Sequence, residues 1–149
     1  MSQISLIRRI AARPTIVFDA LITADGIASW WGPDDFPVIS AEADAEMSRT
    51  FRVRFRTVDG LEHECTGEFL QVKRPERVLM TWRWVSGGVP DERDRVSHLE
   101  FRLRAIDIGT ELTLVHSGLS NDESARSHEG GWGGALEKLV RQFSADPNP

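Results

Sequence analysis

The chain has 149 residues, of which 40% are hydrophobic and 28% charged, with a net charge of −5 at pH 7. These values are typical of one globular domain and exclude a disordered chain, a collagen-like repeat and a membrane bundle. An acidic surface attracts neither nucleic acid phosphates nor anionic headgroups, so we expect no nucleic acid partner and no membrane insertion. The single cysteine, Cys65, rules out an internal disulfide and favours a reducing, cytoplasmic location.

The first part of the chain predicts one strand and two short helices. Residues 1–10 alternate apolar and polar side chains, which is typical of a strand. Pro14 suits the first turn of a helix, because a proline there loses no helical hydrogen bond. A second short helix is predicted over residues 25–31, ended by Gly32-Pro33. The apolar face of the first helix consists of Val17, Phe18, Leu21 and Ile22.

From about Val38 onward the apolar residues recur with period two, which predicts six strands. The strand predicted over residues 51–56 contains Arg54 and Arg56 and forms a hairpin with the strand that follows it. A two-residue turn after it would bury a glutamate among rings, whereas a three-residue loop over 58–60 places Arg56 opposite Glu62 and Arg54 opposite Glu64. We predict the second register, with the loop glycine left-handed, because it pairs opposite charges across the strands.

The end of the chain predicts one long helix. Ser120 and Glu123 have the spacing of a capping box, in which each side chain caps the other's backbone N–H. Four glycines interrupt the helix, and each costs about 1 kcal/mol relative to alanine. Either the helix approaches the sheet closely at these glycines, or it is loosened so that it can move. Residues 146–149 are expected to be a disordered tail after a single domain over 1–145. The four glycines are Gly130, Gly131, Gly133 and Gly134.

The order of these elements and several local motifs resemble the helix-grip fold of the START-like (SRPBCC) superfamily. Within it, the chain resembles the family named after the C-terminal domain of the activator of heat-shock-protein-90 ATPase, from Ile4 to Phe143. The resemblance implies an α+β fold in which a curved antiparallel sheet wraps around the long C-terminal helix and leaves a cavity. The motifs are Ala12-Arg13-Pro14, Trp30-Trp31-Gly32-Pro33, Gly67-Glu68-Phe69, Pro75-Glu76-Arg77, Gly109-Thr110-Glu111-Leu112 and His128 with Gly131-Trp132.

The candidate site residues are the side chains expected to face that cavity. They pack as ordinary core or they line a pocket, and the sequence leaves both interpretations open. Polar candidates that would orient a ligand are Ser97, His63, His116 and His128. The full set is Trp30, Trp31, Phe36, Phe51, Phe55, Phe69, Met80, Trp82, Trp84, Ser97, Phe101, His116, His128 and Trp132.

Three functions fit this sequence. The first is reversible binding of a small, mainly apolar molecule, with no catalytic residue. The second is a cofactor-independent cyclase or dehydratase that uses His116, with Ser97 or His128, as acid or base. The third is a chaperone-modulating domain, with a role in stress response, whose contact would be the charged stripe of Arg52, Arg54, Arg56 and Glu64. We expect no metal and no cofactor, because the histidines and Cys65 lack paired ligand motifs. The chain is expected to be a monomer or a homodimer.

Overall fold

The computed structural model describes residues 2–32, 38–57, 59–88, 92 and 95–143. In this part of the chain, seven antiparallel strands form one sheet in the order β1-β7-β6-β5-β4-β3-β2. The predicted order of one strand, two short helices, six strands and a long helix is confirmed. The elements are β1 (Ser2–Ile10), α1 (Pro14–Ile22), α2 (Ala24–Ala28), β2 (Ser40–Asp44), β3 (Thr50–Arg56), β4 (Glu62–Lys73), β5 (Arg77–Ser86), β6 (Ser97–Ile106), β7 (Gly109–Leu119) and α3 (Asp122–Gln142).

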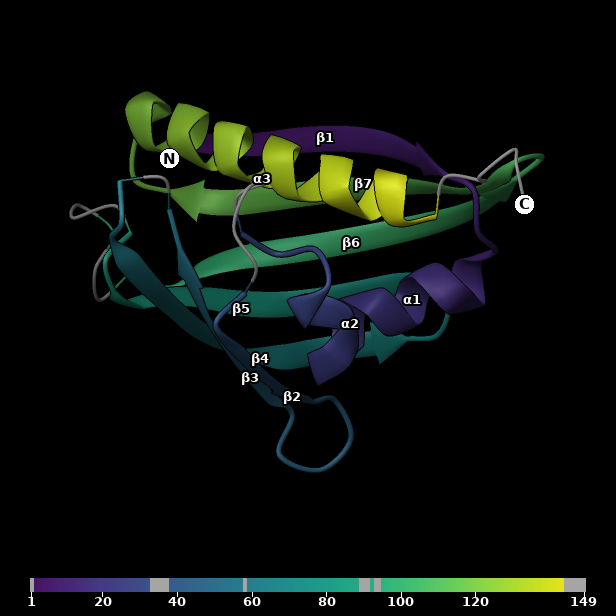
Figure 1. Cartoon of the computed structure of the whole chain (residues 1–149), viewed down its shortest axis with the longest axis horizontal. Helices are drawn as coiled ribbons and strands as arrows, with labels where there is room; N and C mark the ends of the chain where they lie inside the picture. The colour runs from purple at the N-terminus through teal and green to yellow at the C-terminus, as the bar shows by residue number, and fades with distance from the viewer. Residues whose placement is uncertain (1, 33–37, 58, 89–91, 93–94, 144–149) are drawn as a thin grey trace.

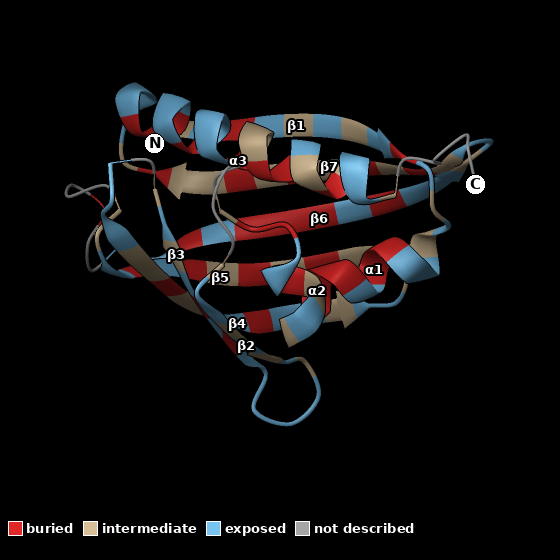
Figure 2. Ribbon diagram, viewed as in Figure 1, coloured by how far each residue is buried: buried red, intermediate tan, exposed pale blue. Residues whose placement is uncertain are grey.

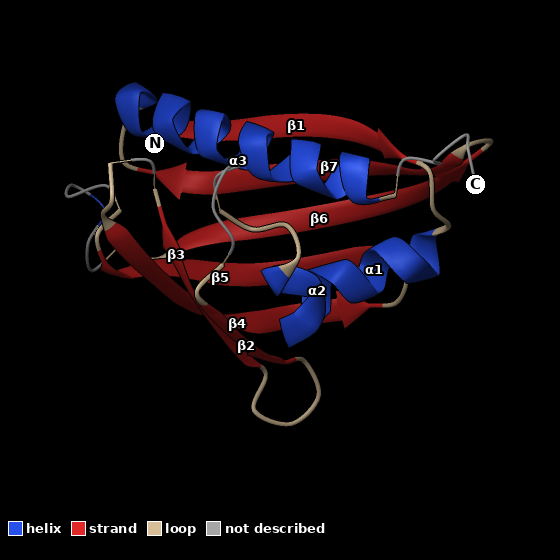
Figure 3. Cartoon of the chain, in the orientation of Figure 1, coloured by secondary structure: helices blue, strands red, loops and turns tan. Residues whose placement is uncertain are grey.

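The helices of the described chain lie on one face of the sheet, as Figures 1 and 3 show. α3 runs along β1 and β7, where Arg8 Nε lies 3.0 Å from Glu137 Oε1. α1 and α2 lie in front of the other half of the sheet. Lys138 Nζ donates to the Trp31 carbonyl oxygen at 2.9 Å, which ties α3 to the segment after α2. This is the predicted helix-grip arrangement.

The predicted hairpin register is confirmed. Arg54 pairs with Glu64 and Arg56 with Glu62 across β3 and β4. Gly60 has a φ of 84°, which only glycine adopts without strain. The ion pairs continue along both strands, since Arg54 Nη2 lies 2.7 Å from Glu62 Oε1. The stripe that could contact a chaperone is therefore neutralised largely by its own cross-strand partners.

The start of α3 differs from the prediction. Asn121, not Ser120, caps the helix, and its side chain accepts a hydrogen bond from the Ser124 N–H at 2.8 Å. Ser120 instead donates its backbone N–H to Glu92 at 3.0 Å. The predicted capping box is therefore not formed. The helix cap lies one residue later than predicted, and Glu92 accepts the Ser120 N–H. The second helix is also shorter than predicted and ends at Ala28.

The core lies between the sheet and the helices, and buried residues recur along β5, β6 and β7 (Figure 2). Leu99, Phe101 and Leu114 are fully buried there, as their alternation predicts. Glu100 alternates with these inward residues and points to the outer face of the sheet, yet it is only 8% exposed. Arg77 and Arg102 cover its carboxylate with ion pairs on the outer face of the sheet, which explains the burial.

The glycines of α3 do not mark a close approach to the sheet. A Cβ added at Gly130, Gly131 or Gly134 would meet nothing within 4 Å, and one at Gly133 would meet only the end of the Arg8 side chain, at 3.9 Å. The first of the two predicted explanations is therefore wrong. The glycines lower the intrinsic stability of α3 without a packing gain.

Gly130→Ala and Gly131→Ala are each expected to raise the free energy of unfolding by about 0.5–1 kcal/mol, because alanine adds helix propensity without a clash. Urea denaturation measures this change. Gly67→Ala is the matched control. Its Cβ would lie 2.0 Å from the Thr81 carbonyl oxygen, so this variant should be destabilised. A loss of stability in either α3 variant would contradict the open position of these glycines.

Candidate functional site: an aromatic and histidine cluster between the sheet and α3

The predicted aromatic residues meet around Trp82 of β5. The Trp82 ring centroid lies 5.2 Å from that of Trp132 in α3, 5.4 Å from that of Trp31 and 5.4 Å from that of Trp84. Trp31 follows α2, so three distant segments contribute to one cluster. The predicted site residues with ring contacts in this cluster are Trp30, Trp31, Phe51, Phe69, Trp82, Trp84, Phe101, His116, His128 and Trp132.

The other predicted residues lie at the margin of the cluster or outside the description. Met80 is fully buried in the core. Phe55 is only half-buried and stacks on His63 at 5.4 Å, with 20° between the ring planes. His63 in turn accepts a hydrogen bond from the Gly88 N–H at 2.7 Å. Phe36 and the tail over 146–149 lie outside the described residues.

His116 of β7 is fully buried and has both ring nitrogens occupied. Nδ1 accepts the indole N–H of Trp132 at 3.0 Å, and Nε2 lies 2.8 Å from Ser97 Oγ. Because Nδ1 accepts, the ring hydrogen must be on Nε2, and Ser97 receives it. Burial lowers the pKa of His116 well below its usual value, helped by the neighbouring histidines His128 and His98. His116 is therefore a neutral, fully hydrogen-bonded group.

Glu92 is a buried residue of the site that the sequence analysis missed. It is 4% exposed and lies between β5 and β6. One carboxylate oxygen lies 2.7 Å from His128 Nε2, and the other accepts hydrogen bonds from the Ser120 N–H and the Ser124 hydroxyl. These hydrogen bonds lower the pKa of Glu92 despite its burial, so the carboxylate is ionised.

His128 of α3 contacts both His116 and Glu92. Its ring centroid lies 4.6 Å from that of His116, and Glu92 holds its Nε2 atom. Burial lowers the pKa of His128, and the Glu92 carboxylate opposes that shift without cancelling it. His128 is therefore a neutral base at pH 7 beside a permanent negative charge. No single sequence signal marks Glu92, because its segment is rich in charged residues and only the fold brings it to α3.

Three of the indole N–H groups in the cluster are buried without an acceptor. Trp31, Trp82 and Trp84 have no hydrogen-bond partner for Nε1 among the described residues. The other two indoles are satisfied, since Trp30 donates to the Ala20 carbonyl oxygen at 2.8 Å and Trp132 donates to His116. A buried donor without a partner costs about 1–3 kcal/mol, and folded proteins contain only a few of them. Three in one cluster therefore require an explanation.

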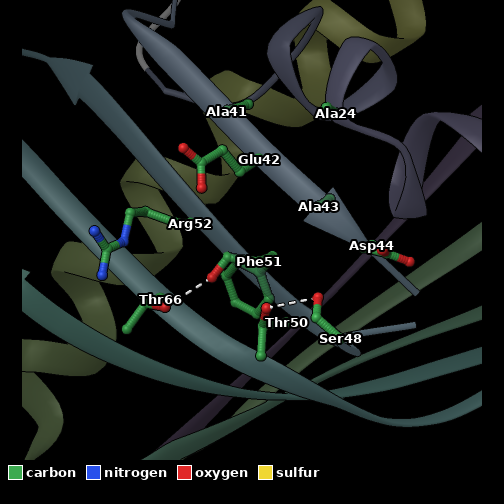
Figure 4. A pocket seen from close by; sticks show the side chains of 10 residues that line it. All are labelled: Ala24, Ala41, Glu42, Ala43, Asp44, Ser48, Thr50, Phe51, Arg52 and Thr66. Carbon is green, nitrogen blue, oxygen red and sulfur yellow. Dashed lines mark hydrogen bonds between the residues drawn. The ribbon is translucent and has the colours of Figure 1, made fainter. Parts of the chain in front are cut away.

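The rings of the cluster contact one another, with centroid distances of 5.2–6.5 Å among the tryptophans and phenylalanines. An open depression of about 750 Å³ lies elsewhere, where β2 and β3 meet Ala24 (Figure 4). Its lining includes one predicted site residue, Phe51, together with charged residues such as Glu42 and Arg52. A ligand that inserts between these rings would have to separate them.

The sequence comparison identifies the family. The profile described as Activator of Hsp90 ATPase homolog 1-like protein matches residues 11–144. The chain belongs to this family. The resemblance inferred from the motifs is thereby confirmed, and with it the START-like superfamily. No curated protein sequence matches the chain.

Solved structures of similar proteins share the whole fold. The AHSA1 protein from Silicibacter pomeroyi is 27% identical, with a TM-score of 0.81, and the match covers 95% of this chain and 96% of that one. A protein from Chromobacterium violaceum is 23% identical, with a TM-score of 0.81 and coverage of 98% and 100%. An AHSA1-like protein from Aeromonas hydrophila is 20% identical, with a TM-score of 0.71 and coverage of 94% and 90%. The last two likenesses concern the fold alone.

The described residues contain no group of three or more histidine, cysteine, aspartate or glutamate side chains that could hold a metal ion. None of their helices is long and apolar enough to cross a membrane.

Proposed function

We propose that this protein binds a small, mainly apolar molecule with an oxygen acceptor, in the aromatic cluster between the sheet and α3. The observation that carries the proposal is the set of three buried indole N–H donors on Trp31, Trp82 and Trp84 that have no acceptor among the described residues. Ligand pockets combine apolar walls with a few polar groups that fix the orientation of the ligand. An acceptor on the ligand would satisfy donors that the protein leaves unpaired.

The residues around these donors suit such a ligand. Trp31, Trp82 and Trp132 are aromatic walls from three elements, and their indole rings meet edge to face or tilted at centroid distances of 5.2–5.4 Å. A flat apolar molecule that inserts between these rings would offer aromatic contacts in exchange for the edge-to-face contacts that it breaks. The binding energy then depends on the hydrogen bonds that the ligand adds.

The glycines of α3 would ease the entry of a ligand into the interior. Their Cβ positions face open space, so they contribute no packing that would hold the helix in place. Since they also weaken the helix itself, the middle of α3 can open at lower cost than a glycine-free helix. This use of the glycines is the second explanation that the sequence left open.

The alternatives gain less support. An enzyme that uses His116 as acid or base would need a free ring nitrogen, and both nitrogens of His116 are engaged. The chaperone contact through the charged stripe would need unpaired charge, and Arg52, Arg54 and Arg56 each have a glutamate partner. The fully buried Cys65 agrees with a reducing, cytoplasmic location for the binding protein that we propose.

The proposal is tested with two matched probes on protein labelled with ¹⁵N in its tryptophan indoles. 2-Acetylnaphthalene carries a ketone acceptor, and naphthalene has the same apolar body without it. We expect the ketone to shift the N–H signals of Trp31, Trp82 or Trp84 downfield in a saturable manner, because an acceptor now binds them. Trp30 is the internal control, since its N–H already donates to Ala20.

Assignment of the five signals uses single Trp→Phe variants. If neither probe produces a saturable change, the binding proposal is rejected. If naphthalene shifts the three signals as far as the ketone does, the ligand contacts the rings but does not accept their hydrogen bonds, and the role given to the donors is wrong.

A further inference from the structure

The hydrogen on the His128 ring has a defined position. Glu92 is an ionised carboxylate and can only accept, so His128 Nε2 carries the hydrogen that bridges the 2.7 Å distance to Glu92 Oε1. The other carboxylate oxygen is occupied by Ser120 and Ser124. A neutral histidine has one hydrogen on its ring, so Nδ1 of His128 carries a lone pair.

The ring that carries this lone pair packs in the aromatic cluster. Within the described residues the structure records no hydrogen bond at Nδ1 of His128, whose ring centroid lies 5.8 Å from that of Trp84 and 6.2 Å from that of Trp82. Both of these tryptophans have unpartnered N–H groups. One base and two hydrogen-bond donors without partners therefore lie in one buried neighbourhood.

His116 cannot supply a proton to Nδ1 of His128. Its Nε2 hydrogen goes to Ser97, and its Nδ1 accepts from Trp132. Among the described residues, the charged or titratable groups that face His128 are His116 from β7 and Glu92 from the segment between β5 and β6. A proton for Nδ1 must then come from the ligand or from solvent.

We infer that the ligand of the proposed site is an apolar weak acid, such as an aromatic carboxylic acid or a phenol, which is bound as its anion with its proton on Nδ1 of His128. The inference rests on the proposed function and names its ligand class. A ligand that is un-ionised in solution transfers its proton, so its O–H bond breaks as an N–H bond forms on Nδ1. A ligand that is already ionised in solution binds together with a proton from solvent, which forms the same N–H bond. The imidazolium donates its other hydrogen to Glu92, and the ligand oxygens accept from the indole N–H groups.

This arrangement avoids an unpaired charge in the interior. An anion that entered without a proton would lose its hydration with no cation to replace it, which costs several kcal/mol. When the proton moves to His128, the ligand anion faces an imidazolium that Glu92 already orients. Glu92 is thus a positioning residue, because it acts on the ligand through His128.

The test measures protons as well as affinity. The probes are 2-naphthoic acid, which is ionised in solution at pH 7, and 2-acetylnaphthalene, its neutral counterpart. Calorimetry in two buffers of different ionisation enthalpy counts the protons taken up. We expect about one proton per acid bound and none for the ketone, with affinity for the acid falling about tenfold per pH unit above pH 7.

Glu92→Gln separates this inference from a structural role. A glutamine amide in this position donates to His128 Nε2, which moves the ring hydrogen to Nδ1 and removes the base. We expect this variant to lose about tenfold or more in affinity for 2-naphthoic acid, together with the proton uptake, while the ketone binds as before. His128→Gln, which keeps a donor toward Glu92, should behave in the same way if Glu92→Gln does not fold. Glu100→Gln is the matched control, because Glu100 is a buried carboxylate on the other face of the sheet.

Binding of the acid without proton uptake would overturn the inference, and so would an unchanged affinity in Glu92→Gln. In both cases the ketone would still bind, and the proposed function would stand. Failure of both probes to bind wild-type protein would reject the proposed function itself.

Discussion

Trp82→Ala is expected to lower the free energy of unfolding by about 3–5 kcal/mol, the largest single effect in this protein. Trp82 is 4% exposed and has ring contacts with Trp31, Trp84 and Trp132. Alanine would leave a large cavity between the sheet and α3, where neighbours from three elements cannot all close in. Urea denaturation at pH 7.5 measures the change, and a loss below about 1 kcal/mol would mean that the cluster is loosely packed.

Phenylalanine variants separate ring packing from hydrogen bonding. Trp82→Phe removes an indole N–H that has no partner among the described residues, so it loses packing alone. Trp132→Phe also removes the donor to Nδ1 of His116 and leaves a buried acceptor unpaired, which adds about 1–3 kcal/mol. We therefore expect Trp132→Phe to be the more damaging of the two. Equal losses would indicate that the Trp82 indole has an acceptor in the ligand-free protein.

Mild acid is expected to destabilise the protein well above the pH at which carboxylates titrate. Burial lowers the pKa values of both His116 and His128 below the ordinary 6.5. In the unfolded chain these histidines take up protons as the pH falls through 6.5, whereas in the folded protein they remain neutral. The unfolded state then binds more protons, so stability is full above pH 6.5 and is lost below it.

Each histidine contributes a slope of up to about 1.4 kcal/mol per pH unit below this value. Denaturation curves at intervals between neutral pH and mild acid measure the combined slope. Glu92 acts in the same direction only at lower pH, because its pKa is depressed from 4.5 and its hydrogen bonds are lost when it is protonated. His116→Asn keeps one donor and one acceptor and should reduce the slope by about one histidine's share. An unchanged slope in this variant would show that His116 is protonated in the folded state.

The strands and their faces were predictable from local pattern. Along β5 the buried residues Val78, Met80, Trp82 and Trp84 alternate with exposed or half-buried ones, because successive strand residues point to opposite faces of the sheet. The hairpin register between β3 and β4 was also predictable, since the loop length and the paired charges agree.

The polar half of the site was predictable only in part. Ser97, His116 and His128 were chosen because they lie on inward-facing positions of a strand or a helix. Their contacts were not predictable, because Ser97 and His116 are 19 residues apart and His128 reaches across to Glu92, 36 residues away. Glu92 itself has no periodic neighbours that would mark it as buried. The offset helix cap has the same origin, since Glu92 takes the Ser120 N–H from the expected capping box.

The amino-acid sequence by itself determined the α+β element order, the inward faces of the strands and the family, because period and turn chemistry act over a few residues. Only the tertiary structure decided which inward groups are satisfied. It places His116 within hydrogen-bond distance of Ser97 and Trp132, and the Glu92 carboxylate within hydrogen-bond distance of His128. It also left three indole donors without an acceptor among the described residues. Hydrogen bonding between buried groups depends on distances across the core, and those distances follow from how the sheet and α3 pack rather than from any local pattern.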